Sequence, residues 1–410
     1  MENLRVDGQR LWNSLMEMAK IGATEKGGVC RLALTDLDKR SRDLFIAWCE
    51  QAGCRVSVDP IGNIFARRPG RDNSLPPVVT GSHLDSQPTG GKFDGAYGVL
   101  AGLEVLRALN DGAVETEAPV EVAVWTNEEG SRFAPAMMGS GAYAGLFPVE
   151  DIYAATDVDG KRFGDELARI GYKGEPRGEP SIGAYFEAHI EQGPILETEG
   201  RTIGIVTGAQ GQRWYEITLT GMEAHAGPTP MARRRDALVG AAEIVRLVNR
   251  IGHEFQPDAC ATVGMMQVHP NSRNVIPGRV FLTIDFRHPD DDRLAAMDAA
   301  LRREAAAIAE KTKLDLDLEQ ILDFQATPFD PGCVAAVRAG AERFGYSHRD
   351  IISGAGHDAV YIAKIAPAGM IFVPCEDGIS HNEIENATLE DLAAGCQVLL
   401  HAVLEKAGAR

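Results

Sequence analysis

Residues 77–98 read Pro-Val-Val-Thr-Gly-Ser-His-Leu-Asp-Ser-Gln-Pro-Thr-Gly-Gly-Lys-Phe-Asp-Gly-Ala-Tyr-Gly. The first apolar residues predict a short strand, which presents His83 and then Asp85 where it ends. A loop with turn-forming glycines follows and brings Asp94 to the start of an apolar helix. Ligands bind at the carboxyl ends of strands in open α/β sheets, and a histidine with two aspartates suits zinc, manganese or cobalt. The stretch therefore predicts a metal site, although a His-x-Asp tripeptide alone is more often an ordinary loop.

The composition is that of a soluble globular protein with more than one domain. The chain has 410 residues, of which 44% are hydrophobic and 24% are charged, and this length predicts two or three domains. Lysine and arginine number 41 against 59 acidic residues, a net charge of −18. This surplus argues against nucleic acid or an anionic membrane surface as a partner. An anionic small molecule stays open, because a site can be locally positive.

The cysteine pattern, together with the lack of a signal-peptide profile and of a long apolar run, predicts a cytoplasmic location. The seven cysteines are odd in number, scattered and free of any Cys-x-x-Cys pair, which favours reduced thiols. The first residues lack the basic and then apolar profile of a signal peptide. No apolar run approaches the roughly 20 residues that span a bilayer.

Two further strand ends carry residues suited to catalysis. The apolar strand predicted over residues 119–126 runs into Asn-Glu-Glu-Gly, which contains Glu128 and Glu129. Adjacent glutamates are most often solvated surface residues. Successive residues that leave a strand point to different sides, so one carboxylate can bind metal while its neighbour faces the substrate. A strand over 185–190 contains His189 close to its end.

The last such element is a strand over 369–374, whose following loop carries His381. Further elements are expected along the same part of the chain. These are helices over 5–20, 36–53, 96–109 and 332–344, a strand pair over 55–66, a strand over 203–207 and a final helix from Thr388.

The pattern changes at about residue 212. From there the sequence predicts, in order, a strand, a helix, two strands, a helix and a strand, which is the order of a ferredoxin-like split unit. We therefore expect an inserted α+β domain over residues 212–326, and a metal-binding catalytic domain formed by residues 1–211 and 327–410.

The first domain thus offers enough ligands for two metal sites that share a bridging aspartate. Such two-metal sites hold a water between the ions and lower its pKa. Glu128 is then available as the general base and acid, and Asp85 fits a carboxylate that orients a ligand imidazole. The candidate ligands are His83, Asp94, Glu129, His189 and His381.

These motifs, taken together, resemble those of a known family. His83-Leu-Asp85, Gly-Gly-Lys-Phe-Asp94-Gly, Thr-Asn-Glu128-Glu129-Gly, His189-Ile-Glu-Gln192-Gly-Pro and Ser-His381-Asn-Glu are similar to those of the aminoacylase and dipeptidase-like two-metal amidohydrolases. More narrowly they resemble the carbamoylase branch, which contains N-carbamoyl-L-amino acid hydrolases, β-ureidopropionases and allantoate amidohydrolases. The resemblance covers nearly the whole chain. It implies an α/β fold with a mixed-sheet, peptidase-like catalytic domain and an inserted ferredoxin-like lid and dimerisation domain.

The resemblance also implies how the ligands divide. Asp94 would bridge two divalent ions, His83 and His189 would hold one of them, and Glu129 and His381 the other. Zinc is the expected metal, and manganese, cobalt or nickel are alternatives that the ligand types also tolerate.

Other residues take their roles from the resemblance as well. Glu128 would be the base, and the inserted domain would form a homodimer. His225 in that domain would reach the neighbouring subunit's site and stabilise the oxyanion. Without the resemblance, a lone loop histidine such as His225 is a solvated or capping residue.

The carboxylate substrate would be held by residues that match the binding groups of this branch: Gln192, Asn274, Arg287 and, less closely matched, Arg213. Arg287 at a strand end can clamp a carboxylate with two hydrogen bonds, and a surface salt bridge is the alternative. His357 matches a segment near the substrate, and the alternative is a helix-start histidine without a ligand role.

The predicted activity is hydrolysis of an N-carbamoyl-L-amino acid or N-carbamoyl-β-alanine to the amino acid, carbon dioxide and ammonia. Allantoate amidohydrolase is the nearest alternative. A dipeptidase or aminoacylase on the same scaffold and a non-catalytic binding protein are the others. The expected partners are a small carboxylate substrate and a second copy of the chain, with neither nucleic acid nor membrane.

Overall fold

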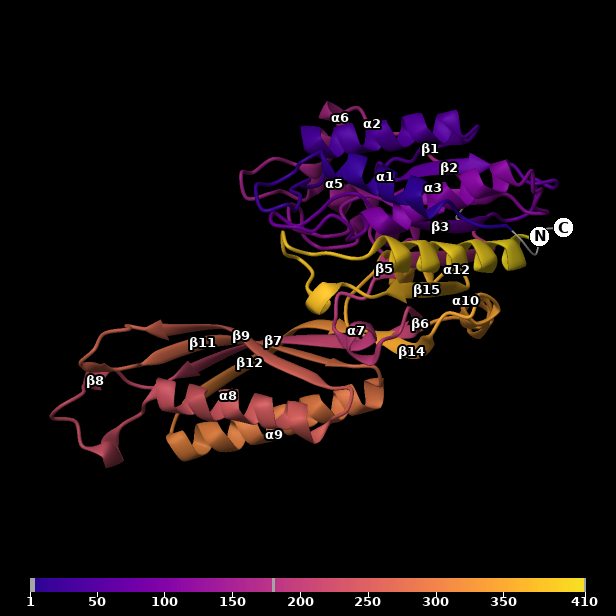
Figure 1. Cartoon of the computed structure of the whole chain (residues 1–410). Coiled ribbons are helices and arrows are strands. Elements are labelled where there is room, and N and C mark those ends of the chain that lie inside the picture. Colours follow the sequence, from indigo (N-terminus) through magenta and orange to yellow (C-terminus); the bar gives the residue numbers. More distant parts are fainter. Residues whose placement is uncertain (1–3, 179–180, 409–410) are drawn as a thin grey trace. The chain divides into compact units, whose positions relative to one another are not determined.

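The computed structural model describes residues 4–178 and 181–408 (Figure 1). It divides into two compact units, one formed by Met1–Thr207 with Phe329–Arg410 and the other by Gly208–Pro328. The borders expected from the sequence lie at 211/212 and 326/327. The roles of lid and dimerisation domain that the resemblance assigns to the insertion stay predictions.

Four parallel strands form the centre of the first unit's sheet. They are β3 (Val78–His83), β4 (Val120–Trp125), β5 (Ala184–Ile190) and β15 (Ala368–Val373), in the order β4-β3-β5-β15. Every residue of these strands is buried, as continuous apolar runs covered on both faces require. Their carboxyl ends therefore meet at one edge of the sheet.

Antiparallel strands extend this centre, so the sheet is mixed, as predicted. On the β4 side the order continues to β2 and β1, and on the β15 side to β6, which also pairs with β14. The bounds are β1 (Arg55–Val58), β2 (Ile64–Arg68), β6 (Ile203–Ala209) and β14 (His348–Ser353).

Helices cover both faces of the sheet, and alternate strand residues point into two different cores. Val78 belongs to the larger core and Val79 to the smaller one on the opposite face. The larger core takes in α1 (Gly8–Ala19), α3 (Ala96–Asp111), α10 (Pro331–Arg343) and α12 (Leu389–Ala407), and α2 (Asp36–Gln51) lies against β1. The smaller core takes in α11 (Asp358–Ile362).

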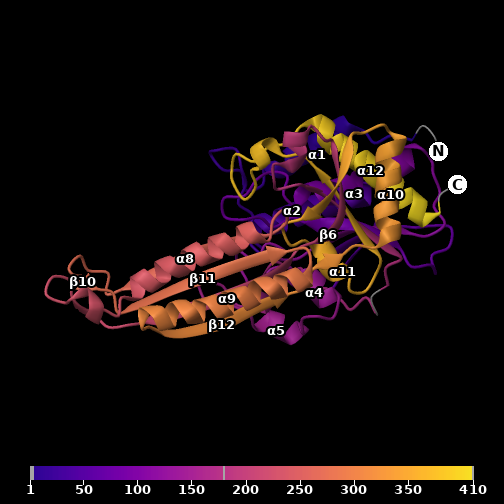
Figure 2. The same ribbon diagram turned by 90° about the horizontal axis from the view of Figure 1, so that it is seen from below.

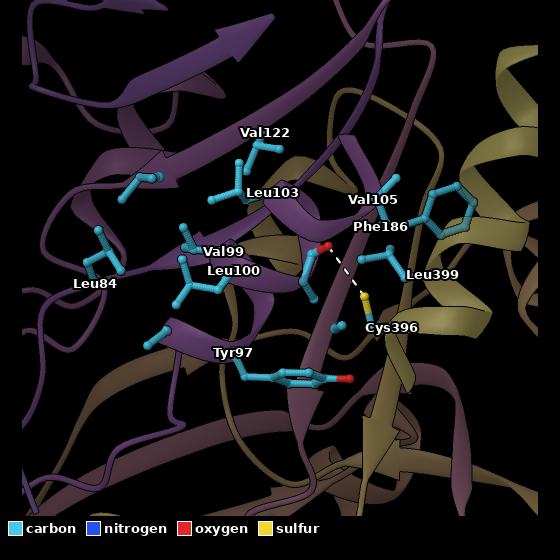
Figure 3. Close-up of a cluster of buried hydrophobic side chains, with 14 of the residues drawn as sticks. Leu84, Tyr97, Val99, Leu100, Leu103, Val105, Val122, Phe186, Cys396 and Leu399 are labelled. Atoms are coloured by element: carbon cyan, nitrogen blue, oxygen red, sulfur yellow. Dashed lines mark hydrogen bonds between the residues drawn. The ribbon is translucent and has the colours of Figure 1, made fainter. Parts of the chain in front are cut away.

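Helix α3 is buried almost all round, and Figure 3 shows its side chains packed among those of β4, β5 and α12. Two polar atoms are satisfied inside this core: the Tyr97 hydroxyl donates to the carbonyl of Leu392 at 2.8 Å, and the Cys396 thiol donates to that of Ala101 at 3.5 Å. The start of α3, which follows Asp94, is thereby fixed by a densely buried core.

Several short elements are not expected from the sequence, most of them because they carry too few residues for a periodicity to show. They are α4 (Met138–Tyr143), α5 (Val149–Ala154), α6 (Phe163–Arg169), α7 (Ile195–Glu199), β14, the two-residue strands β8 (Ala224–His225), β10 (Val275–Ile276) and β13 (Thr327–Pro328), and the 3-10 turns η1 (Met231–Arg233) and η2 (Glu376–Gly378).

The second unit has the predicted ferredoxin-like element order. Its antiparallel sheet has the order β12-β7-β11-β9, and two helices lie side by side along it (Figure 2). Along β11 the residues alternate between buried and partly exposed, as expected for a sheet covered on one face. The elements are β7 (Gly211–Thr220), α8 (Ala237–Glu254), β9 (Cys260–His269), β11 (Arg279–His288), α9 (Asp291–Thr312) and β12 (Asp315–Phe324).

Among the described residues, no helix combines the length and the apolar character that a bilayer span requires.

The core around α3 gives a stability prediction. Leu103 is fully buried, so Leu103→Ala leaves a cavity and lowers the free energy of unfolding by about 2–5 kcal/mol. Leu146, which is 45% exposed, provides the control, since Leu146→Ala should change it by less than about 0.5 kcal/mol. Urea unfolding of the three proteins measures both, and equal effects at the two positions would contradict this packing.

Candidate metal centre

The predicted ligands lie at the shared edge of the parallel strands. His83 ends β3, Glu129 follows β4, His189 is the penultimate residue of β5 and His381 lies in the loop after β15. Asp94 comes from the loop between β3 and α3. Two groups of potential ligand atoms result, and the atoms of each group all lie within 4.8 Å of one another. One group comes from His83, Asp94 and His189, and the other from Asp94, Glu129 and His381.

Asp94 is the residue common to both groups, and its two oxygens face different partners. Oδ1 lies 3.5 Å from Nε2 of His83 and 3.2 Å from Nε2 of His189. Oδ2 lies 3.4 Å from Nε2 of His381, whose Nε2 is also 3.4 Å from Oε2 of Glu129. This is the arrangement of a carboxylate that can bridge two cations.

Two of the histidines are held in the tautomer that suits a metal ligand. Nδ1 of His83 lies 2.9 Å from the carbonyl oxygen of Asp85, and Nδ1 of His189 lies 2.9 Å from that of Ile190. A carbonyl oxygen only accepts, so each Nδ1 carries the hydrogen. When the ring is neutral, as a metal ligand must be, its lone pair is then on Nε2, which points toward Asp94.

The charges in this buried group are not balanced by the side chains alone. Burial, reinforced by the charge of Asp94, raises the pKa of Glu129 to about 8. Burial opposes protonation of His83 and His189, but the nearby carboxylates outweigh it and raise the pKa of both. For Asp94, hydrogen bonds from His189 and His83 outweigh burial and hold the pKa well below its usual range. A cation would compensate this concentration of carboxylates, so the donor set fits divalent metal ions.

Glu128 lies beside the ligands without belonging to either group. Its Oε2 is 3.5 Å from Nε2 of His83, and burial raises the pKa of Glu128 well above its usual range although His83 opposes the shift. Neighbouring Glu129 faces His381 instead. The two adjacent glutamates therefore point to different partners, which is the arrangement expected for one ligand and one base.

The carboxylate of Asp85 has different partners from those that the sequence analysis expects. His83 contacts the main-chain oxygen of Asp85, whereas the Asp85 carboxylate accepts hydrogen bonds from the main-chain N–H groups of Glu128 and Glu129, both at 3.2 Å. The main-chain oxygen of Asp85, and not its carboxylate, therefore orients the imidazole of His83. The side chain instead fixes the loop that carries both glutamates.

Gln192, predicted to bind substrate, contacts the centre itself. Its Nε2 donates to Oδ2 of Asp94 at 3.0 Å and lies 3.2 Å from the hydroxyl of Ser380. His357 is buried with its ring centroid 4.6 Å from that of His189, and burial lowers its pKa well below the usual value. His357 also forms a third group of potential ligands with Glu187 and His189. Both residues therefore lie next to the predicted ligands.

The remaining predicted residues belong to the second unit, Gly208–Pro328, and each has partners within it. Arg213 forms an ion pair with Asp323 at 3.1 Å, and Arg287 forms one with Asp285 at 2.8 Å. Their roles toward a substrate stay predictions.

The other two, Asn274 and His225, are exposed residues of the same unit. Asn274 accepts at its main-chain oxygen from the N–H of Ala226. His225 accepts at Nδ1 from the N–H of Gly227 at 3.0 Å. This bond leaves the ring hydrogen of the neutral imidazole on Nε2.

Asn127, Gln192 and His381 in the site loops have left-handed backbone conformations, with φ of 56°, 58° and 52°. Such conformations cost free energy in residues other than glycine and persist only where the surroundings impose them. Asn127 and Gln192 redirect the chain two residues after the ends of β4 and β5, and His381 redirects it within the longer loop that follows β15.

Two residues that the sequence analysis does not single out hold the ligands. Gln87 donates from its side chain and from its main chain to Glu129, at 2.6 and 3.0 Å. Glu385 accepts from the main-chain N–H groups of Phe93 and Asp94. Neither has a distinctive motif, because what places them is a long-range approach of the chain.

A model of peptidase family M20/M25/M40 matches residues 79–405. The chain belongs to this family. The matched range contains all five predicted ligands and the whole second unit.

Close relatives of this M20/M25/M40 member are amidohydrolases. An N-carbamoyl-L-amino-acid amidohydrolase of Rhizobium meliloti is 52% identical over 99% of this chain and 98% of its own. An allantoate amidohydrolase of Escherichia coli is 33% identical over 95% and 96% of the two chains. The crystal structure of an amidase of the hydantoinase/carbamoylase family from Burkholderia multivorans is 67% identical with a TM-score of 0.95, covering 98% of each chain.

The protonation of the metal-free centre gives a pH prediction for this family member. Since the pKa values of His83, His189 and Glu129 are raised, the metal-free centre holds protons near neutral pH that a cation must displace. Metal binding should therefore release protons and strengthen as the pH rises from about 6 to about 8. Titration calorimetry with Mn²⁺ in buffers of different ionisation enthalpy measures this release. Binding of Mn²⁺ without proton release and with an affinity that does not depend on pH would contradict this prediction.

Proposed function

We propose that this chain hydrolyses N-carbamoyl amino acids, such as an N-carbamoyl-L-amino acid or N-carbamoyl-β-alanine, to the amino acid, carbon dioxide and ammonia. The observation that carries the proposal is the convergence of four ligand-type side chains, those of His83, His189, Glu129 and His381, on Asp94, with Glu128 beside them. The full-length relative at 52% identity supports the choice of substrate class.

The proposed cofactor is a pair of divalent cations that share Asp94. His83 and His189 would hold one, and Glu129 and His381 the other. When bound, the cations would make a nearby water more acidic and polarise the carbamoyl oxygen. Zinc is the metal that we propose, with manganese, cobalt and nickel as alternatives for these nitrogen and oxygen donors.

Glu128 would move the proton in this reaction. It accepts a proton from the attacking water and gives it to the nitrogen of the departing amino acid, which leaves as a neutral amine. The surroundings of Glu128 support this role, because burial favours the protonated carboxyl that the second step needs. Asp85 keeps Glu128 in place through the loop amides.

The second unit would supply the substrate contacts. Arg287 and Asn274 would hold the substrate carboxylate, with Arg213 in support, and Gln192 and His357 would line the site from the first unit. A substrate carboxylate would take the place of Asp285, which now pairs with Arg287.

His225 would stabilise the oxyanion in the neighbouring subunit of a homodimer formed through residues 212–326. Its Nε2 carries the ring hydrogen in the neutral form, since Nδ1 accepts from Gly227, and an N–H donor is what a developing oxyanion requires. We place the enzyme in the cytoplasm.

Allantoate hydrolysis is the second candidate. It is favoured by the relative from Escherichia coli, whose identity to this chain is 33% against 52% for the carbamoylase.

The substrate choice can be measured directly. Protein loaded with Zn²⁺, Mn²⁺ or Co²⁺ should release ammonia from N-carbamoyl-L-methionine or N-carbamoyl-β-alanine with a higher kcat/KM than from allantoate, N-acetylmethionine or a dipeptide. Removal of the metal with a chelator should abolish turnover, and adding it back should restore it. A higher kcat/KM on allantoate would overturn the proposed substrate, and activity unaffected by metal removal would overturn the mechanism.

A mixing experiment tests the roles of Glu128 and His225 together. Glu128→Gln and His225→Ala should each lower kcat by at least about 100-fold while metal content persists. When the two variants are mixed and allowed to exchange subunits, about a quarter of all sites combine both intact residues, so activity should return to about that level. Mixed protein that stays inactive would show that His225 does not act across a dimer, and full activity of Glu128→Gln would remove Glu128 from its role.

A further inference from the structure

Glu385 is a buried carboxylate in the loop after β15, four residues beyond His381, and it is 1% exposed. The neighbouring acid Glu383 pairs with the surface residue Lys26 instead, at 3.4 Å. Burying a carboxylate is costly unless its oxygens are hydrogen-bonded, so the partners of Glu385 show what its burial achieves.

One oxygen of Glu385 holds the main chain that carries Asp94. Oε1 accepts from the N–H of Phe93 at 3.0 Å and from the N–H of Asp94 at 3.1 Å. These bonds to consecutive amides fix the loop between β3 and α3 at the residue that faces both groups of ligand atoms.

The other oxygen reaches the Asp94 side chain through a hydroxyl. Ser380 Oγ lies 2.9 Å from Oε2 of Glu385 and 3.2 Å from Oδ2 of Asp94. A serine hydroxyl has one hydrogen, so it can donate to only one of the two carboxylates at a time. The Ser380 hydroxyl therefore lies between the two carboxylates and connects Glu385 to Oδ2 of Asp94.

The loop glycine makes this approach physically possible. A Cβ added at Gly91 would lie 2.0 Å from the carboxyl carbon and Oε1 of Glu385 and 2.4 Å from Oε2. These distances are far below van der Waals contact, so the backbone without a side chain at position 91 is what admits the carboxylate.

From these contacts we propose that Glu385 is a positioning residue that holds Asp94 in its bridging orientation for two divalent cations. The proposal rests on the metal centre of the proposed function. Its role parallels that of Asp85, which accepts from the consecutive N–H groups of Glu128 and Glu129. Two buried carboxylates thus each fix one ligand loop through two main-chain donors.

The first test is metal affinity, measured by competition of Zn²⁺ or Mn²⁺ between a chelator and the metal-free protein. Glu385→Ala should weaken binding by about 10–100-fold, as loss of a residue that supports a ligand does. Glu385→Gln keeps an oxygen for the two N–H groups, so its loss should be smaller. Gly91→Ala, which displaces the carboxylate without removing it, should weaken binding as well.

The control variant is Glu104→Ala. Glu104 is also fully buried and accepts from a main-chain N–H, that of Asp7 at 2.9 Å, and from Arg10, but it lies in α3 away from the ligands. Glu104→Ala should lower the unfolding free energy yet leave metal affinity unchanged, which separates general destabilisation from positioning.

The second test needs no metal and no substrate. Hydrogen exchange followed by mass spectrometry should show faster exchange of peptides that contain Phe93 and Asp94 in Glu385→Ala and Gly91→Ala than in wild type or Glu104→Ala. If Glu385→Ala does not fold, Gly91→Ala carries both readouts.

The outcomes separate the two proposals. Absence of carbamoyl hydrolysis or of metal binding in the wild type would overturn the proposed function, while the exchange rates would still decide the role of Glu385. Wild-type metal affinity together with wild-type exchange in folded Glu385→Ala would overturn the positioning role.

Discussion

The structure depends on the burial of one carboxylate, Asp94, among three imidazole rings and further acids. An isolated carboxylate in such a place is strongly disfavoured, and neighbouring acids make the penalty larger. Asp94 is 5% exposed, and its two oxygens face His83 and His189 on one side and His381 on the other. A pair of divalent cations would satisfy this constraint, because each oxygen would then face a positive charge.

The fold meets the constraint with rigid elements. The ligands come from four adjacent parallel strands and from the loop ahead of α3, the most deeply buried helix. The loops that carry Glu129 and Asp94 are fixed by Asp85 and Glu385, which each accept from two consecutive main-chain N–H groups. The left-handed backbone conformations of Gln192 and His381 also determine the direction in which their side chains point. Ligand geometry is thus set by main-chain hydrogen bonds as much as by the ligands themselves.

Much of this was accessible from the sequence, for reasons that differ between elements. The buried strands and α3 have long apolar runs, and His83, Glu129 and His381 stand at or after strand ends, so their convergence follows from the parallel order. The ferredoxin-like insertion shows in its element order. The elements between residues 131 and 183 were missed because α4, α5 and α6 are too short to show a period.

The supporting contacts could not be read from the sequence. Glu385 meets Asp94 across 291 positions of sequence, and no local pattern announces such an approach. The same holds for Gln87 and Glu129, which are 42 positions apart. It also holds for the Asp85 carboxylate, which meets the N–H groups of Glu128 and Glu129 across 43 and 44 positions. A sequence shows which residues leave a strand, whereas the partners that fix them are set by the packing of distant loops.

Electron paramagnetic resonance of the protein titrated with Mn²⁺ tests most directly whether Asp94 bridges two cations. If Asp94 bridges two cations, they lie about 3.5–4 Å apart, and the spectrum should change, as the second equivalent binds, from that of an isolated ion to that of an exchange-coupled pair. A chain that binds one Mn²⁺, or two that give only the spectrum of isolated ions, would contradict the account.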